Sequence, residues 1–345
     1  MNEIECERRL REDVAKICPP SGRMVGSDGH RHAREYLAGR LQEIGVRPYR
    51  GSSFGMTYRD DEREFFNLTG VVPCGEGRRP PVLIGAHYDS AIAAPSADDN
   101  AAAVAIALAA ATQLAGLRLG RDVVVALFDA EEPPYYKDPN MMGSMRFYRD
   151  QMHPEGVHAA VIMDLVGHDV RVPIEGADKM RPGISDLICM TGAESHPEMA
   201  GLVARQDFGR LVPVATLNSN IDDMSDHFVF RTHGIPYLFL SCGRWEHYHE
   251  PSDTPDRLNY TKMARICELL VGLTVALAGA ALVRPPATSG IPVECDTVEL
   301  ELRLFRDAFG PLLPTLLAAC RLRQLETRDD LDNMARALPR LILPQ

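Results

Sequence analysis

Four short runs of continuous apolar residues constrain the fold of this 345-residue chain more than any other feature. They are rich in Val, Ile, Leu and Ala, alternate with segments of helical character, and cover residues 82–86, 123–128, 159–163 and 236–240. Strands that are apolar along their whole length are typical of a parallel sheet whose two faces are both buried. The pattern therefore predicts an α/β fold in which helices sandwich a mostly parallel mixed sheet.

The helices expected around this sheet cover residues 2–17, 30–44, 99–114, 143–150 and 260–282. Residues 285–290 read Pro-Pro-Ala-Thr-Ser-Gly and predict a linker, which two further helical stretches follow at 297–323 and 329–338. We therefore expect one large domain at 1–284, and a linker with a C-terminal helical appendage at 285–345. The amphipathic appendage is expected to pack against its own domain, although it would also suit docking, an oligomer contact or a pocket lid.

Composition excludes several kinds of partner. With 37 Lys and Arg against 48 Asp and Glu, the net charge is −11, which disfavours nucleic acid and anionic membranes as partners. The longest apolar stretch, residues 269–283, is shorter than the roughly 20 residues that span a bilayer. The charged N-terminal residues lack the apolar core of a signal peptide, so we expect a cytoplasmic location. The eight scattered cysteines contain no Cys-x-x-Cys and predict reduced, mostly buried thiols.

Acidic and imidazole side chains follow three of the predicted strands where each strand ends. His87 and Asp89 follow the first strand, Glu131 and Glu132 the second, and Asp164 the third. Ligands bind at this edge in open α/β sheets. A carboxylate near a histidine suits a metal ligand with its orienting partner, and adjacent glutamates suit a ligand beside a general base. A structural histidine and a solvated acidic turn are the plainer alternatives.

Two further groups complete the candidate set. Asp98 and Asp99 precede an Ala-rich helix, where one Asp could simply cap the helix. His247 and His249 lie in a late loop, and spacing alone does not choose between them. Two imidazoles with three carboxylates fit two first-row cations, with Zn²⁺ favoured and Mn²⁺ or Co²⁺ also compatible. Three carboxylates and one bridging hydroxide would balance the charge of two dications.

These motifs resemble the M28 family of zinc peptidases, which contains aminopeptidases and glutaminyl cyclases. The resemblance covers roughly residues 23–282. It rests on pieces that occur in the family's order, at residues 26–29, 85–90, 97–100, 128–132, 143–144, 163–164, 225–227 and 248–254. The resemblance implies metal-assisted hydrolysis of peptide or aminoacyl-amide bonds, as in an aminopeptidase that releases N-terminal residues.

The resemblance also implies roles for individual residues. The implied ligands of two zinc ions are His87, Asp99, Glu132, Asp164 and His249. Asp99 would bridge the two ions, Glu131 would be the general base, and Asp89 would orient His87. The family pattern selects His249 over His247, and Asp226 falls where family members place an acid near the substrate.

Other functions stay open from the sequence. The segment 133–142 matches glutaminyl cyclases in length, whereas 251–255 is peptidase-like, so a cyclase-like acyltransferase with a single zinc is the main alternative. A non-catalytic binding protein on the same fold is another, because fold does not fix function. A serine hydrolase is disfavoured, since the G-x-S-x-G match at 51–55 lacks the buried strand that a nucleophile elbow requires.

Overall fold

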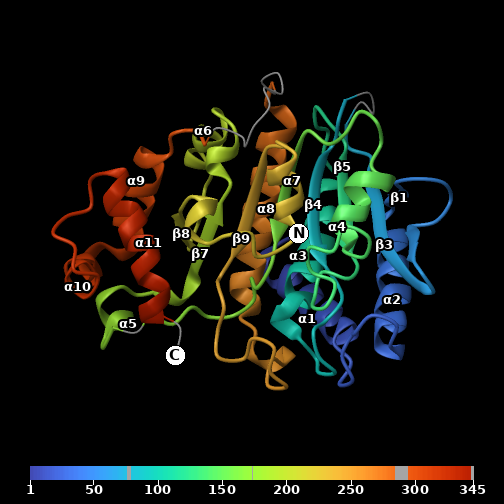
Figure 1. Ribbon diagram of the computed structural model, residues 1–345, viewed down its shortest axis with the longest axis horizontal. Helices are drawn as coiled ribbons and strands as arrows, with labels where there is room; N and C mark the ends of the chain where they lie inside the picture. Colours follow the sequence, from blue (N-terminus) through green and yellow to red (C-terminus); the bar gives the residue numbers. More distant parts are fainter. Residues whose placement is uncertain (76–78, 173, 284–293, 343–345) are drawn as a thin grey trace.

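The computed structural model describes residues 1–75, 79–172, 174–283 and 294–342. Nine strands within these ranges form one sheet, in the order β1-β3-β5-β4-β6-β9-β7-β8, with β2 paired to β3 outside this path (Figure 1). The strands are β1 (Arg47–Pro48), β2 (Gly55–Asp60), β3 (Arg63–Val72), β4 (Val82–His87), β5 (Val123–Phe128), β6 (Ala159–Met163), β7 (Leu187–Thr191), β8 (Val212–Ala215) and β9 (Tyr237–Ser241).

The centre of the sheet is parallel, as the apolar runs predict. Strand β4 pairs in parallel with β5 and β6, with Val82 opposite both Val123 and Ala159, and β6 pairs in parallel with β9. The flanks add antiparallel pairs, because β3 runs against β5 and β7 runs against β9. The predicted mixed sheet is confirmed: its centre is parallel, whereas four of the eight strand pairs among the described residues are antiparallel. The strand ends that carry the candidate residues meet at one edge.

Helices cover both faces of this sheet. One apolar cluster joins alternate residues of the central strands to α1 (Glu3–Ile17), α2 (Asp28–Ile44), α3 (Ala102–Leu114), α6 (Met199–Ala204) and α8 (Tyr260–Gly279). The opposite cluster contains Phe147 and Phe230, which lie at the end of α4 (Gly143–Arg146) and in α7 (His227–Thr232). Successive residues of β5 belong to opposite clusters: Val125 lies in the first cluster and Val124 in the second. Both faces are therefore buried, which explains why the central strands are apolar throughout.

The C-terminal helices α9 (Val298–Phe309), α10 (Leu313–Ala319) and α11 (Arg328–Ile342) lie beside β7 and β8 at one end of the sheet (Figure 1). Their apolar side chains, Phe309 among them, share a buried cluster with Leu187 and Val212 of these strands. The appendage thus packs against its own sheet. The linker expected at 285–290 lies outside the described residues, so the boundary between 284 and 285 stays a prediction.

Several helix bounds differ from those expected. The helix predicted at 297–323 is interrupted by the turn Gly310–Leu312, where Gly310 has φ +30° and Pro311 removes a backbone donor. The helix predicted to start at Asp99 starts instead at Ala102, after the irregular turn Ala97–Ala101. The shorter helical pieces are α5 (Ala177–Met180) and the turns Phe147–Gln151, Ile184–Asp186, Ala193–Ser195, Asn218–Asn220 and Pro255–Arg257.

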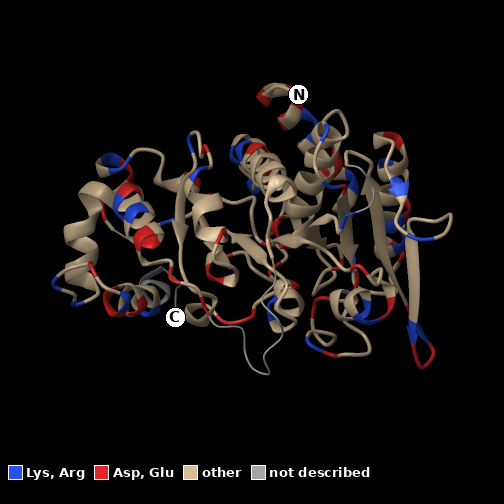
Figure 2. Ribbon diagram, turned by 90° about the horizontal axis from the view of Figure 1, so that it is seen from above, with Lys and Arg blue, Asp and Glu red and all other residues tan. Residues whose placement is uncertain are grey.

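The remaining general expectations concern charge, thiols and membranes. Acidic and basic residues are interspersed over helices and loops, while the central strands are almost free of both (Figure 2). All eight cysteines are free thiols, and most are buried, as expected. Among the described residues, no helix combines the length and the apolar character needed to cross a membrane.

Candidate metal centre

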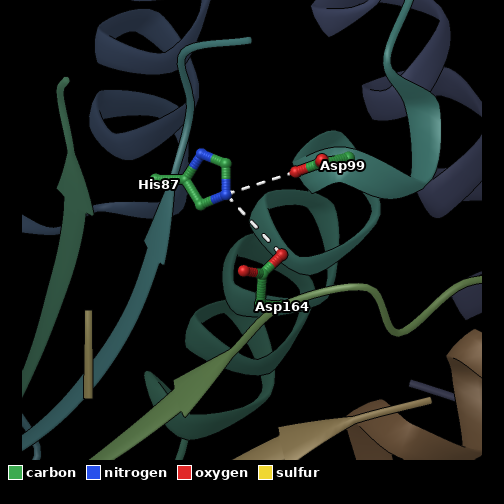
Figure 3. A group of neighbouring side chains, drawn as sticks. All are labelled: His87, Asp99 and Asp164. Carbon is green, nitrogen blue, oxygen red and sulfur yellow. Dashed lines mark ion pairs between the residues drawn. The ribbon is translucent and has the colours of Figure 1, made fainter. Parts of the chain in front are cut away.

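Three side chains from different parts of the chain converge at the edge of the sheet. His87 is the last residue of β4, Asp164 follows β6 directly, and Asp99 lies in the turn before α3 (Figure 3). The His87 Nε2 atom is 3.4 Å from Asp99 Oδ1 and 3.6 Å from Asp164 Oδ1. All three residues are buried. One imidazole and two carboxylate oxygens thus face a common point, as in a metal site.

A second set of ligand atoms shares Asp99 with the first. His249 Nε2 lies 3.1 Å from Asp99 Oδ2 and 3.1 Å from Glu132 Oε2. These three residues each offer a ligand atom within 4.8 Å of the others. The two oxygens of Asp99 therefore face different partners, His87 on one side and His249 on the other. The structure brings together all five residues for which the sequence predicts a metal-ligand role.

The unsatisfied polar atoms of this cluster fit a bound cation. Among the described residues, no hydrogen-bond partner exists for four buried ligand atoms, namely Asp99 Oδ2, Glu132 Oε1, Asp164 Oδ1 and His249 Nε2. Buried polar atoms are nearly always hydrogen-bonded, and buried charges are paired or coordinate metals. A mixed set of imidazole and carboxylate ligands suits zinc. The residues present therefore fit the metal that the sequence predicts.

Glu131 and Asp89 are buried next to the same cluster of ligand residues. The Asp89 carboxylate accepts the backbone N–H groups of Glu131 and Glu132, each at 3.1 Å, and its Oδ1 is 3.3 Å from His87 Nδ1. One side chain thus contacts both the histidine and the loop that carries the glutamates. Glu131 Oε2 is 3.7 Å from His87 Nε2, so its carboxylate reaches the same space as the ligands.

Burial and crowded negative charge shift the pKa values of this cluster. Burial raises the pKa of Glu131 well above its ordinary value, against the opposing charge of His87. Burial and the charge of Asp99 raise the pKa of Glu132 to about 8. For His249, burial acts to lower the pKa, but Asp99 and Glu132 outweigh it and raise the pKa to about 10. Without a cation the cluster therefore holds protons at neutral pH, and a bound metal would displace them.

Comparison with known proteins decides the family. The sequence model of peptidase family M28 matches residues 67–274, which is more than half of the chain. The chain belongs to peptidase family M28. Membership supports a metal-dependent, peptidase-like hydrolase that uses zinc. The number of zinc ions and the kind of bond attacked belong to the proposal below.

Individual relatives agree with this M28 fold. The uncharacterized protein YfbL of Escherichia coli K12 is 29% identical over 230 residues, which cover 59% of this chain and 69% of YfbL. A glutaminyl cyclase of Porphyromonas gingivalis has a TM-score of 0.56 at 18% identity, covering 79% of this chain and 97% of the cyclase. The LapA aminopeptidase of Legionella pneumophila has a TM-score of 0.62 at 17% identity, covering 80% of this chain and 71% of LapA. At such low identity, these two structures establish a shared fold only.

Asp226 lies buried beside this M28 centre. Its side chain is fully buried, and neither oxygen makes a hydrogen bond of normal geometry among the described residues, although the nearby Ser144 hydroxyl acts to lower its pKa. Burial raises the pKa of Asp226 to about 7, with the negative charges of Asp89 and Asp164 adding to the rise and the charge of His87 opposing it. The residue predicted to lie near the substrate thus sits within the electrostatic reach of the centre.

Two other sequence candidates lie outside the M28 centre. His247 shares a hydrogen bond with Ser252 Oγ at 2.8 Å through Nδ1, and it belongs to none of the clusters of described residues that could hold a metal. Ser53, the central residue of the G-x-S-x-G match, is exposed and its Oγ accepts the nearby Gly55 N–H. Among the described residues, no basic side chain is hydrogen-bonded to Ser53 Oγ, as a serine nucleophile would require.

Segment 133–142 lies close to the M28 centre. The Tyr136 hydroxyl donates to the carbonyl of Asp223, three residues before Asp226. Tyr58 anchors the far end of the segment by donating to the carbonyl of Met141 at 2.8 Å. Burial, together with the charge of Glu131, raises the pKa of Tyr136, as expected for a phenol close to these carboxylates. These two bonds tie the segment to its surroundings at Tyr136 and Met141.

Asp253 is a residue that sequence reasoning did not single out. Its buried carboxylate accepts the backbone N–H of Asp98 at 2.9 Å and that of Asp99 at 3.1 Å. It therefore fixes the main chain of the predicted bridging ligand. Asp253 belongs to the same 248–254 piece as His249, but nothing in that piece marks its contact with Asp99.

Proposed function

We propose that this chain is a di-zinc aminopeptidase that releases N-terminal residues from peptides or aminoacyl amides. The observation that carries the proposal is the placement of Asp99, whose Oδ1 is 3.4 Å from His87 and whose Oδ2 is 3.1 Å from His249. A single carboxylate facing two separate ligand sets suits a bridge between two ions. Two-metal sites of this kind occur in aminopeptidases.

The five ligands divide into two sets around this bridge. His87 and Asp164 would hold one ion together with Asp99, and Glu132 and His249 would hold the other. Zinc bound there would polarise a carbonyl and lower the pKa of a water molecule. Asp89 orients His87 by lying 3.3 Å from its Nδ1, which favours the tautomer that leaves Nε2 free to ligate.

Glu131 is the proposed general base. Its buried carboxylate has a raised pKa and is therefore a stronger base than a solvated glutamate. Glu131 takes a proton from the attacking water and then delivers it to the leaving amine. The Asp89 carboxylate accepts the Glu131 backbone N–H and so holds the base in place while it moves this proton.

The acidic surroundings favour substrates with a free amino terminus. Asp226 is buried next to the centre and, when ionised, would attract a substrate ammonium group. An N-terminal amine drawn toward this charge would set the first peptide bond at the reacting position. Exopeptidase rather than endopeptidase action follows from this arrangement.

A glutaminyl cyclase is the second candidate. The segment 133–142, which places Tyr136 against Asp223, favours it because a segment so placed would enclose a small substrate side chain. The shared fold with the Porphyromonas gingivalis glutaminyl cyclase is compatible with this function.

Glu131→Gln tests the proposed base. Because the amide cannot take a proton, turnover of an aminoacyl amide should fall by about 10²–10⁴-fold, while zinc content stays unchanged. The matched control is Glu155→Gln, which alters an exposed glutamate. Full peptidase rate in the Glu131 variant would refute the assignment of the base.

A substrate panel separates the two candidates. Aminoacyl amides, N-blocked peptides and an N-terminal glutaminyl peptide are each assayed with and without chelator, and zinc is counted per chain. Chelator-sensitive cleavage of unblocked substrates with two zinc ions supports the aminopeptidase. Ammonia release from the glutaminyl peptide alone, with one zinc ion, supports the cyclase.

A further inference from the structure

Arg23 is a buried cation without a carboxylate partner among the described residues. It has no exposed surface, and it lies in the connection between α1 and α2. It is also outside the residues 67–274 that match the M28 model. Burying a guanidinium is costly unless its donors are satisfied. The contacts that satisfy Arg23 therefore indicate what its burial stabilises.

The shortest of those contacts are to carbonyl groups of the two segments that carry metal ligands, while longer ones, at 3.4 Å and 3.8 Å, reach the Ile17 carbonyl and Cys18 Sγ at the end of α1. Arg23 Nε donates to Tyr88 at 2.8 Å, between His87 and Asp89. Arg23 Nη1 donates to Pro95 at 2.6 Å, and Nη2 donates to Ser96 at 2.9 Å. The Arg23 backbone N–H also donates to Ser90 Oγ at 2.7 Å. One side chain thus joins the segment after β4 to the segment before α3.

Hydrogen bonds from two other segments fix the main chain of Asp99, one at its carbonyl and one at its N–H. Arg23 Nη2 reaches the Asp99 carbonyl at 3.3 Å, while the Asp253 carboxylate accepts the Asp99 N–H at 3.1 Å. Asp99 itself has a non-helical backbone, with φ −111° and ψ 86°, so the regular hydrogen bonds of α3 do not fix it. The position of this carboxylate therefore depends on contacts from outside its own segment.

We propose that Arg23 is a positioning residue for the metal centre: its planar fork fixes Tyr88 and the 95–99 segment relative to each other, so that His87 and Asp99 meet at ligating distance. This inference rests on the proposed metal-dependent function. Lysine cannot replace arginine here, because its single nitrogen cannot reach carbonyls that three guanidinium nitrogens contact from different directions. Metal sites need ligands held within about 0.5 Å of the productive geometry.

The close approach of the neighbouring main chain supports a rigid junction. A Cβ atom added to Gly22, which has φ +71°, would lie 2.5 Å from the Ile92 carbonyl and 2.7 Å from the Ala94 amide nitrogen. The chain just before Arg23 is thus packed directly against the segment that links Ser90 to Pro95. Arg23 therefore lies where two main-chain segments pack tightly against each other, and not in a loosely packed loop.

Arg23→Lys tests the positioning role, with Arg40→Lys as the matched control. Arg40 is also buried, but it pairs with Asp13 between α1 and α2, away from the metal centre. We expect the zinc dissociation constant of Arg23→Lys to rise about 10–100-fold in a chelator competition. That of Arg40→Lys should stay within about twofold of the parent, even if both variants lower the melting temperature of the metal-free protein.

Cobalt loading adds a readout that loss of stability would not move. The visible absorption of Co²⁺ reports ligand geometry, so it should change in Arg23→Lys and stay unchanged in Arg40→Lys. Unchanged zinc affinity and spectrum in Arg23→Lys would overturn the proposal, as would equal changes in both variants. If Arg23→Lys does not fold, Ser90→Ala replaces it, since it removes the acceptor of the Arg23 backbone N–H, together with the Ser90 hydroxyl bond to the Ile92 carbonyl, and leaves the guanidinium in place. Zinc binding weakened at least about threefold would then support the role, and unchanged binding would overturn it.

A failure of the proposed metal-dependent function can be distinguished from a failure of the positioning role of Arg23. If the unmodified protein binds no zinc or cobalt, the proposed metal-dependent function fails. If the unmodified protein binds metal and only the Arg23 variants are unaffected, the positioning role alone fails.

Discussion

Replacing Asp226 by asparagine should stabilise the metal-free protein at high pH. Asp226 is fully buried and makes no hydrogen bond of normal geometry among the described residues, and the nearby Ser144 hydroxyl offsets its burial only in part, so its ionised form is poorly solvated. Its folded-state pKa is raised to about 7 from an ordinary value of 3.8. Because the folded form holds this proton more tightly than the unfolded chain, stability is lost as pH rises from about 4 to about 7.

The size of the effect follows from the shift. A difference of 3.2 pKa units, from 7 − 3.8, corresponds to about 4 kcal/mol, at about 1.36 kcal/mol per unit. The amide side chain of the variant cannot ionise, so the variant escapes this destabilisation. Above pH 7 we therefore expect up to about 4 kcal/mol greater stability for Asp226→Asn, and no pH-dependent gain below about pH 4.

The assay is urea unfolding of chelator-treated protein at about pH 4, 6 and 8, which bracket the pKa window. The free energy difference between the variant and the parent should grow across this series, and bound zinc should reduce it by stabilising the carboxylate. Asp256→Asn is the control, because Asp256 is exposed. A difference that is the same at all three pH values, or a variant less stable than the parent at the highest pH, would refute the reasoning.

Two further predictions concern the metal and the C-terminal helices. Zinc affinity should rise with pH between about 6 and 9, because zinc must displace protons from Glu132 and His249, whose pKa values are raised to about 8 and about 10; a flat profile in chelator competition would contradict this. Phe309→Ala should lower the free energy of unfolding by about 3–5 kcal/mol, because Phe309 is almost fully buried beside β8, and urea unfolding measures this loss.

The central sheet could be predicted because its strands are apolar on both faces. The predicted run 159–163 coincides with β6, and 123–128 coincides with β5. The flanking strands β3 and β8 gave no such signal. Strand β3 begins with Arg63 and Glu64, and β8 contains Pro213, so neither is a continuous apolar run. Their pairing depends on neighbours that are distant in sequence, which local composition does not encode.

The site could be predicted where a ligand follows a strand. His87 and Asp164 come directly at strand ends, and parallel strands bring those ends together. His249 required a family resemblance, since spacing did not separate it from His247. Arg23 and Asp253 act through backbone atoms 76 and 154 residues away at Asp99, and no local pattern marks such contacts. Their roles required three-dimensional structure.

The position of the C-terminal helices has a consequence for biosynthesis. A ribosome completes every proposed metal ligand by His249, yet α9 begins only at Val298. Until α9, α10 and α11 emerge, Leu187 and Val212 lack the apolar partners that cover them in the folded structure. Nascent chains with exposed apolar surface are prone to association. A nascent chain that has passed His249 but not yet reached Val298 should therefore depend on chaperones, although all of its proposed ligand residues have already been made.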